Sequence, residues 1–152
     1  RMKSKLYKVL HPVCGKPMVG HVVTALEHIN TSRTVVVVGH GAEAVQAYFG
    51  DRVEYALQEK QLGTGHAVLQ AKPLLENEDG LTIVICGDTP LVSEETLRDM
   101  IRTHQQKGAA ATILTAVIDQ PRGYGRIIRD AQGYVNAIVE EKDCNDEQRR
   151  VQ

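Results

Sequence analysis

The fold of this 152-residue chain is decided by residues 34–67, TVVVVGHGAEAVQAYFGDRVEYALQEKQLGTGHA. Residues 34–38 are a continuously β-branched run, which is typical of a strand covered on both faces. Residues 42–48 have the pattern of a helix, 53–57 that of a second short strand, and 64–75 that of another helix. Strands that alternate with helices of this length predict parallel pairing with right-handed crossovers.

The same alternation continues on both sides of this segment. Apolar residues at helical spacing predict a helix over 18–29, and LTIVIC predicts a strong strand over 81–86. Ser93 has the position of an N-cap for a helix that runs to about Lys107 and ends at Gly108. A further apolar strand is expected over 111–118.

The rhythm changes after Asp119. Residues 126–129 and 134–139 are short strands separated by DAQG, which predicts a hairpin, and the charged tail that follows predicts an exposed helix or loop. The sequence therefore predicts one α/β domain over 1–152, with a doubly wound, mostly parallel sheet and a small β-hairpin near the C-terminus.

Composition excludes several classes of protein. The chain is 42% hydrophobic and 24% charged with a net charge of −1, which is ordinary for a soluble globular domain and gives no basic field for nucleic acid. No apolar run is long enough for a membrane span, and the first residues lack the apolar core of a signal peptide. Three widely spaced cysteines match neither a disulfide framework nor a zinc pattern, so a cytoplasmic location is expected.

The stretch QEKQLGTGHA, residues 58–67, is the first candidate site. Gly63 and Gly65 bracket Thr64 where a helix is expected to begin, and the unpaired N–H groups of a helix start favour anions or polar ligand groups. Two glycines also let a ligand approach the backbone closely. The alternative is an ordinary loop in which Thr64 caps the helix.

Asp88 is the most informative single position. It follows LTIVICG directly, so it is expected at the carboxyl end of a buried strand, the edge at which open parallel sheets bind ligands. An aspartate held there suits Mg²⁺, which uses one or two carboxylates together with substrate phosphates. An aspartate that merely caps a turn is the competing interpretation.

Other polar residues are expected at the same edge. Arg1 and Lys8 lie in a basic, irregular loop, Gln58 ends a predicted strand, and Gly125 and Glu140 flank the hairpin. Amide, backbone N–H and carboxylate groups at one rim can bind a base, a sugar and a polyphosphate together. Nucleotidyl transfer therefore fits better than redox or hydrolase chemistry, since no Ser-His-Asp or Cys-His arrangement is visible.

Six blocks of this sequence resemble a known family: RMKSKLYKVLHPVCGKPM, VVGHGAE, LQEKQLGTGHA, VICGDTPL, GYGRIIR and VEEKD. They are similar to the N-terminal uridyltransferase domain of the bifunctional bacterial enzymes that make UDP-N-acetylglucosamine. The blocks run from the first residue to about residue 148 in the family's order, and their combination is highly specific although each is modest alone.

The resemblance implies a nucleotide-diphospho-sugar transferase fold and a defined reaction. UTP and N-acetylglucosamine 1-phosphate would give UDP-N-acetylglucosamine and pyrophosphate with Mg²⁺, supplying precursors of peptidoglycan and lipopolysaccharide. It further implies that Gln58 and Thr64, with Gly63, contact the uracil. Asp88 would hold Mg²⁺, and Gly87 beside it would line the nucleotide site.

The resemblance also implies residues for the sugar and the phosphates. Gly125 and Glu140 would hold the N-acetylglucosamine part, and Arg1 and Lys8 would hold the phosphates. Arg1, Lys8 and Asp88 would thus form the catalytic group. Since the reaction is an in-line attack by one phosphate on another, it needs positioning and positive charge and no covalent nucleophile from the protein.

By the family pattern, several elements are expected outside this chain. A first strand and a glycine-rich loop would precede Arg1, with the strand near the middle of the sheet, and two further asparagines and a β-helix acetyltransferase domain would follow Gln152. The piece is therefore expected to be weak or inactive alone. The family's trimer is built largely by the β-helix domain, so the full-length protein is expected to be a homotrimer and this piece a monomer.

Two rival functions stay open at this point. One is another sugar-1-phosphate nucleotidyltransferase, with a different sugar or base, which a substrate panel distinguishes. The other is a nucleotide-binding fragment that keeps the fold and has lost the chemistry. Nucleic-acid binding is not expected, because the basic residues cluster in one loop without aromatic stacking partners.

Overall fold

The computed structural model describes residues 4–152, which form two compact units that divide between Arg102 and Thr103. Helix α4, Glu94–Lys107, runs across the boundary between them. The two units are described separately. The single domain predicted over 1–152 stays a prediction.

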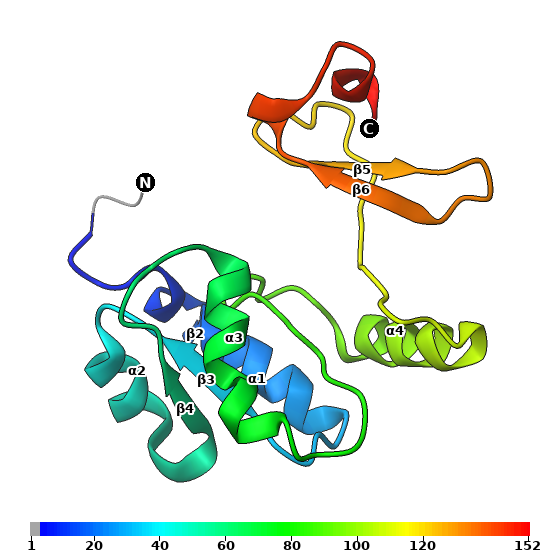
Figure 1. Cartoon of the computed structure of the whole chain (residues 1–152). Coiled ribbons are helices and arrows are strands. Elements are labelled where there is room, and N and C mark those ends of the chain that lie inside the picture. Colours follow the sequence, from blue (N-terminus) through cyan, green and yellow to red (C-terminus); the bar gives the residue numbers. More distant parts are fainter. Residues whose placement is uncertain (1–3) are drawn as a thin grey trace. The chain divides into compact units, whose positions relative to one another are not determined.

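The first unit is an α/β arrangement around one parallel strand pair (Figure 1). Its strands are β1 Pro12–Val13, β2 Lys16–Pro17, β3 Val35–Val38 and β4 Glu54–Leu57. Its helices are α1 Met18–His28, α2 Ala42–Phe49, α3 Thr64–Leu75 and the start of α4, with 3-10 turns η1 Lys8–Leu10 and η2 Gly50–Arg52. The predicted helices and the strands at 34–38 and 53–57 are confirmed to within a residue or so at each end.

Strands β3 and β4 pair in parallel with Val35 opposite Glu54 and Val38 opposite Leu57. A parallel pair needs a crossover between its strands, and helix α2 supplies it. The ladder continues one residue past β4, because the Gln58 N–H donates to Val38 O at 2.7 Å. The carboxyl ends of both strands therefore meet at one edge.

A core of valine, leucine and phenylalanine covers one face of this pair. Val38 of β3 packs with Val23 of α1 and with Val45 and Phe49 of α2, all of them buried. Val36 joins them, as expected from the two-residue period of a strand. The other face is left to α3, which contacts both strands (Figure 1). Helices thus lie on both faces of the pair.

Arg33 ties the start of β4 to the end of α3. Its guanidinium donates to both carboxylate oxygens of Glu54, at 2.8 and 2.6 Å, and to Leu74 O at 2.6 Å. A further bond of 2.8 Å reaches Glu78. These bonds lower the pKa of the Glu54 carboxyl, chiefly through the hydrogen bonds from Arg33. The network holds the edge of the pair opposite to the carboxyl ends.

The strands predicted over 81–86 and 111–118 are wrong, since neither segment belongs to a sheet among residues 4–152. Their apolar side chains lie largely exposed, with Val84 at 63% and Val117 at 80%. A strand exists only where a neighbour supplies N–H and C=O partners. The described residues supply none for these runs, so the one doubly wound sheet is replaced by three two-stranded sheets.

The second unit is built on the predicted hairpin. Strand β5 Arg126–Arg129 pairs antiparallel with β6 Val135–Val139, with an irregularity in register between Ile128 and Arg129. The Asp130 carboxylate accepts from the N–H groups of Gln132 and Tyr134 at 3.0 and 2.9 Å and so shapes the turn. The charged tail forms 3-10 turns η3 Glu141–Asp143 and η4 Gln148–Arg150.

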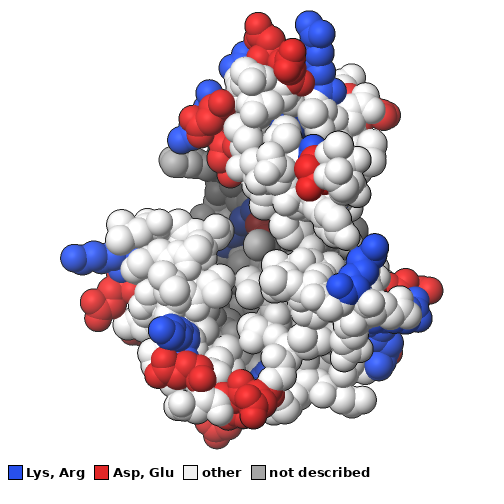
Figure 2. Space-filling view, turned by 45° about the vertical axis from the view of Figure 1, so that its right-hand side comes forward, with Lys and Arg blue, Asp and Glu red and all other residues white. Residues whose placement is uncertain are grey.

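The surface carries charges of both signs. On the face that Figure 2 shows, Lys and Arg side chains lie among Asp and Glu side chains without a broad patch of one sign. This agrees with the net charge of −1. Among residues 4–152, no helix has the length and apolarity that crossing a bilayer requires.

Candidate functional site

Lys8 and Asp88 meet although 80 positions separate them in sequence. Lys8 begins η1 in the N-terminal loop, and Asp88 lies in the turn after residues 81–86. The Lys8 Nζ donates to Asp88 Oδ2, and this hydrogen bond, with the attraction of the carboxylate, raises the pKa of Lys8. The Asp88 side chain is 32% exposed. An ammonium and a partly exposed carboxylate thus lie at one point, and the carboxylate is of the kind that Mg²⁺ takes as a ligand.

Gly87 lets the turn that carries Asp88 pack closely against neighbouring side chains. A Cβ on Gly87 would lie 3.4 Å from side-chain atoms of Val9 and Val19, so the backbone packs directly on η1 and α1. Thr89 closes the turn, because its Oγ1 and N–H both donate to Cys86 O, at 2.6 and 3.2 Å. The position of the carboxylate is therefore set by tertiary packing and by the turn itself.

A pocket of about 480 Å³ lies at the carboxyl ends of β3 and β4. It is lined by Gly39, His40, Leu57, Gln58, Glu59 and Gln61. A Cβ on Gly39 would lie 3.1 Å from the Gln61 amide nitrogen, so glycine leaves room for that side chain. This is the edge at which parallel α/β sheets bind ligands. Gln58 is the predicted site residue that lines it.

Beyond the pocket, a loop leads to the start of α3. The cap residue is Gly63, with φ of +104°, and no side chain caps the helix, so the alternative with Thr64 as N-cap is wrong. Thr64 is the first helical residue. The Gln58 Nε2 lies 3.1 Å from Gly63 O and 3.0 Å from His66 Nδ1. Gln58 is therefore tied to the same helix start that the sequence predicts as a ligand site.

In the second unit, Gly125 and Glu140 lie side by side. The pair Arg126 and Val139 is in register, and these two residues flank it on the same end of the hairpin. A Cβ on Gly125 would lie 3.5 Å from Val139 O. The buried Arg126 holds the preceding turn, donating to Pro121 O at 2.9 Å and to Tyr124 O. A small residue and a carboxylate thus share this end of the hairpin.

The whole length of the chain has known relatives. A family model described as nucleotidyl transferase matches residues 2–148. The chain belongs to the nucleotidyl transferase family. It is 60% identical over 151 residues to the bifunctional protein GlmU of Bacillus subtilis, and 58% identical to that of Geobacillus thermodenitrificans. Each match covers 99% of this chain and 33% of the relative, so the chain spans about a third of the length of these curated relatives.

A solved structure shows the same fold at low sequence identity. HddC from Yersinia pseudotuberculosis, in a crystal structure complexed with GMP-PN, matches with a TM-score of 0.66 at 23% identity. The match covers 92% of this chain and 64% of HddC. Together with the family match, it confirms the predicted nucleotide-diphospho-sugar transferase fold of this nucleotidyl transferase chain.

The predicted site residues of this nucleotidyl transferase chain fall into three groups. Lys8 lies with Gly87 and Asp88; Gln58 lies with Gly63 and Thr64; and Gly125 lies with Glu140. The third group belongs to the second unit. Arg1 lies outside the described residues.

Two residues that contact these groups were not predicted from the sequence. His66 lies in the block LGTGHA, two positions after Thr64, and this closeness to a predicted site residue could have indicated it. Arg126 follows GYG directly, but arginine is seldom buried, so its 4% exposure could not be anticipated.

Among the predicted site residues that the structure describes, Asp88 is the candidate metal ligand. Among residues 4–152, no three His, Cys, Asp or Glu side chains gather as a metal site would need. A single carboxylate fits Mg²⁺, which keeps several waters and takes its remaining ligands from substrate phosphates. It does not fit a metal such as structural zinc, which the protein must enclose with four ligands.

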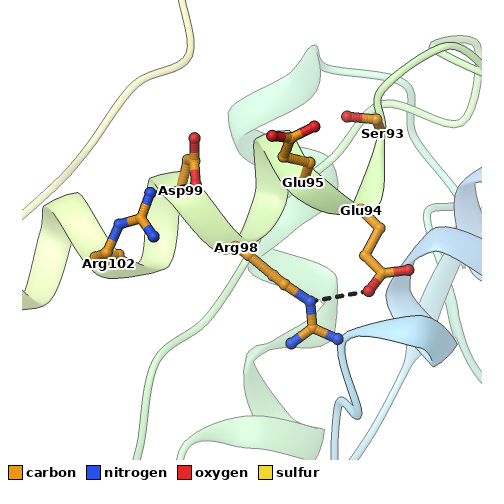
Figure 3. Close-up of a pocket in the computed structure, with 6 residues that line it drawn as sticks. All are labelled: Ser93, Glu94, Glu95, Arg98, Asp99 and Arg102. Atoms are coloured by element: carbon orange, nitrogen blue, oxygen red, sulfur yellow. Dashed lines mark hydrogen bonds and ion pairs between the residues drawn. The ribbon is translucent and has the colours of Figure 1, made fainter.

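A second hollow, of about 520 Å³, lies on α4 and has a different character (Figure 3). Both of its arginines are paired with carboxylates of the same helix. Arg98 Nε donates to Glu94 at 2.9 Å, and an Arg102 nitrogen donates to Asp99 at 2.6 Å. Since two of the carboxylates are already paired with the arginines in an exposed row, the smaller pocket at the strand ends is the better candidate for a ligand site.

Proposed function

We propose that this chain is the nucleotide-binding part of a uridyltransferase that makes UDP-N-acetylglucosamine and pyrophosphate from UTP and N-acetylglucosamine 1-phosphate. The proposal is supported by the six sequence blocks, by the family match over residues 2–148, and by 60% identity to a bifunctional GlmU protein. The observation that carries it is the contact of Lys8 with Asp88 beside strands whose carboxyl ends form a pocket. A cytoplasmic location is part of the proposal, because these substrates are made in the cytoplasm.

In the proposed reaction, an oxygen of the sugar phosphate attacks the α-phosphorus of UTP. The bond from the α-phosphorus to the bridging oxygen breaks, and pyrophosphate leaves with that oxygen and its electron pair. Both reactants are anions, so positive charge must offset their repulsion. Lys8 provides such a charge, since a lysine side chain is protonated at neutral pH and the neighbouring carboxylate raises its pKa further. Arg1 is proposed to contribute in the same way.

The remaining residues bind and orient the substrates. Gln58, Gly63 and Thr64 are proposed to contact the uracil at the start of α3, where backbone N–H groups have no side-chain cap. Asp88 is proposed to hold Mg²⁺, with Gly87 lining the nucleotide site. When bound, Mg²⁺ supplies positive charge to the phosphate oxygens.

The sugar is assigned to the second unit. Gly125 brings its backbone close to the hairpin, since a Cβ there would lie 3.5 Å from Val139 O, and the exposed carboxylate of Glu140 accepts hydrogen bonds from sugar hydroxyl or amide groups. The full-length protein is proposed to be a homotrimer, as the family resemblance implies, with this piece a monomer.

The test is pyrophosphate release from UTP and N-acetylglucosamine 1-phosphate with Mg²⁺. Two proteins are compared: this chain, and this chain fused to the flanking segments of the Bacillus subtilis relative. Each carries Asp88→Ala or, as a matched control, Asp79→Ala in an exposed loop. We expect activity in the fused protein, its loss in Asp88→Ala, and its retention in Asp79→Ala.

Other outcomes decide between the rival functions. Activity that survives Asp88→Ala removes the proposed role of that carboxylate. Activity only with a different sugar phosphate leaves the fold and makes the chain another sugar-nucleotide pyrophosphorylase. Silence with every sugar phosphate, while UTP still binds, favours a nucleotide-binding protein without chemistry.

A further inference from the structure

A backbone turn over residues 121–124 leads directly into Gly125. The turn is closed by the Tyr124 N–H, which donates to Pro121 O at 3.1 Å. Gly123 stands at its third position with φ of +85°, as a type II turn requires. The N–H of that third residue takes no part in closing such a turn. The Gly123 N–H therefore needs a partner elsewhere.

Two side chains from outside the turn bind it. Glu141 Oε2 accepts from the Gly123 N–H, and Arg126 donates to Pro121 O at 2.9 Å and to Tyr124 O. The two side chains also face each other, with Arg126 Nη2 at 3.8 Å from Glu141 Oε1. Arg126 begins β5, and Glu141 follows the end of β6 by two positions. The turn is thus tied to both strands of the hairpin.

This pair is a poor source of stability. The Arg126 side chain is 5% exposed, so its guanidinium has lost most of its water, and its Nε has no hydrogen-bond partner among residues 4–152. A buried donor without a partner lowers stability, and the attraction within a buried ion pair often fails to offset the loss of hydration. Fixing a geometry is therefore the better explanation for an arginine at this position.

The geometry that the pair can fix involves its sequence neighbours. Gly125 lies between the turn and Arg126, and Glu140 immediately precedes Glu141. Glu140 has an extended backbone, with φ of −62° and ψ of 146°, and an exposed side chain. Because Glu141 is bonded to the turn, the backbone of Glu140 is held at the place where the turn enters β5. Loss of either member of the pair frees Gly125 to move against Glu140.

We propose that Arg126 and Glu141 are positioning residues that set the spacing between the Gly125 backbone and the Glu140 carboxylate. Their ligand class is a sugar 1-phosphate, whose ring hydroxyl and acetamido groups need donors and acceptors at a fixed separation. The pair acts through its neighbours and does not itself contact the sugar. The inference rests on the proposed function, since it requires a sugar phosphate at this end of the hairpin.

The test uses the chain fused to the flanking segments of the Bacillus subtilis relative. It measures kcat and the KM values of N-acetylglucosamine 1-phosphate and UTP. Glu141→Ala releases the Gly123 N–H, and we expect the KM of the sugar phosphate to rise about tenfold while kcat and the KM of UTP stay within about twofold. Arg126→Met is expected to do the same. The double variant is expected to be no worse than either single one, because the two side chains act as one unit.

Two further variants separate positioning from general damage. Glu141→Gln keeps an acceptor for the Gly123 N–H and is expected to recover most of the sugar affinity that Glu141→Ala loses. Arg129→Met is the matched control, since Arg129 is the other arginine of β5 and donates to Gly133 O at 3.0 Å at the opposite end of the hairpin. It is expected to retain the wild-type KM values.

Amide hydrogen exchange, followed by NMR on the chain, tests the turn without any ligand. The Gly123 N–H is expected to be protected in the wild type and in Glu141→Gln, and to exchange about tenfold faster in Glu141→Ala. Wild-type exchange at the rate of an unstructured peptide overturns the inference. So does a Glu141→Ala variant in which the KM of the sugar phosphate is unchanged, or in which both KM values rise equally.

Failure of the proposed function looks different. In that case the wild-type fused protein turns over no N-acetylglucosamine 1-phosphate, and the sugar role of the pair falls with it, while Gly123 remains protected in the chain. If Arg126→Met does not fold, the two Glu141 variants remain decisive, because that side chain is 37% exposed. Recovery in Glu141→Gln that is confined to the KM of the sugar phosphate is the result that a merely structural pair does not produce.

Discussion

Gly41 is the glycine whose replacement is expected to do most damage, because it holds the loop that carries Lys8. Its φ is +83°, and a Cβ there would lie 1.9 Å from the Cζ atom of Tyr7. Tyr7 immediately precedes Lys8, and its carbonyl accepts from the Leu10 N–H at 2.9 Å in η1. Gly41→Ala therefore strains the backbone and also displaces the ring of Tyr7, the residue that precedes η1.

The size of the effect follows from two contributions. The left-handed backbone costs a residue with a Cβ about 1–2 kcal/mol. Overlap with a packed side chain adds about 1–3 kcal/mol. Gly15 provides the matched control, since its φ is +82° and a Cβ there would meet nothing within 4 Å. We expect Gly41→Ala to lower the free energy of unfolding by about 2–5 kcal/mol and Gly15→Ala by about 1–2 kcal/mol.

Urea unfolding followed by far-UV circular dichroism measures both losses. A double-mutant cycle then isolates the overlap, because Tyr7→Ala removes the ring that the new Cβ would meet. In the Tyr7→Ala background, Gly41→Ala is expected to cost no more than Gly15→Ala. Equal losses for the two glycine variants in the wild-type background would refute the role assigned to Tyr7.

Three further substitutions test other parts of the first unit. Ser93→Ala removes the cap bond of 3.1 Å from the Thr96 N–H and is expected to lower the free energy of unfolding by about 0.5–2 kcal/mol, measured by urea unfolding. Phe49→Ala empties a site that is 3% exposed, and its expected loss by the same assay is about 3–5 kcal/mol; a loss near zero would contradict the core described here. Arg33 lowers the pKa of Glu54 below 4.5, so this pair stabilises the fold above that pH and the contribution is lost as pH falls below it. Wild type and Glu54→Gln should therefore differ in stability near about pH 6 and converge toward about pH 3, and a constant difference would speak against the pair.

Sequence reasoning anticipated where the candidate site lies better than how its residues interact. The rule that parallel sheets bind ligands at their carboxyl ends pointed to Gln58 and Asp88. The structure places a pocket at Gln58, whereas Asp88 lies in a turn after residues 81–86, which belong to no sheet in the described chain. The sequence also predicted Lys8 at the same edge, but its bond to Asp88 was not predicted. That bond depends on how η1 packs against Gly87, which no local pattern specifies. His66 was missed for a similar reason. Its contact with Gln58 exists only through the path of the loop between them.

The sequence by itself determined the elements whose hydrogen bonds lie within one segment. Helix α3 is predicted and found over Thr64–Leu75, and α4 begins after its Ser93 cap as expected. The hairpin of β5 and β6 could also be predicted, because a short turn brings its two strands together. Each of these depends on residues that are close in the chain.

Only the tertiary structure decided which apolar runs become strands. Residues 35–38 and 81–86 are both apolar, yet the first is β3 and the second is unpaired in the described chain. The difference is that β4 lies in register beside β3, whereas among residues 4–152 no segment offers its backbone to 81–86. A helix contains its own hydrogen-bond partners, but a strand needs a neighbouring strand whose position in the sequence its own residues do not specify.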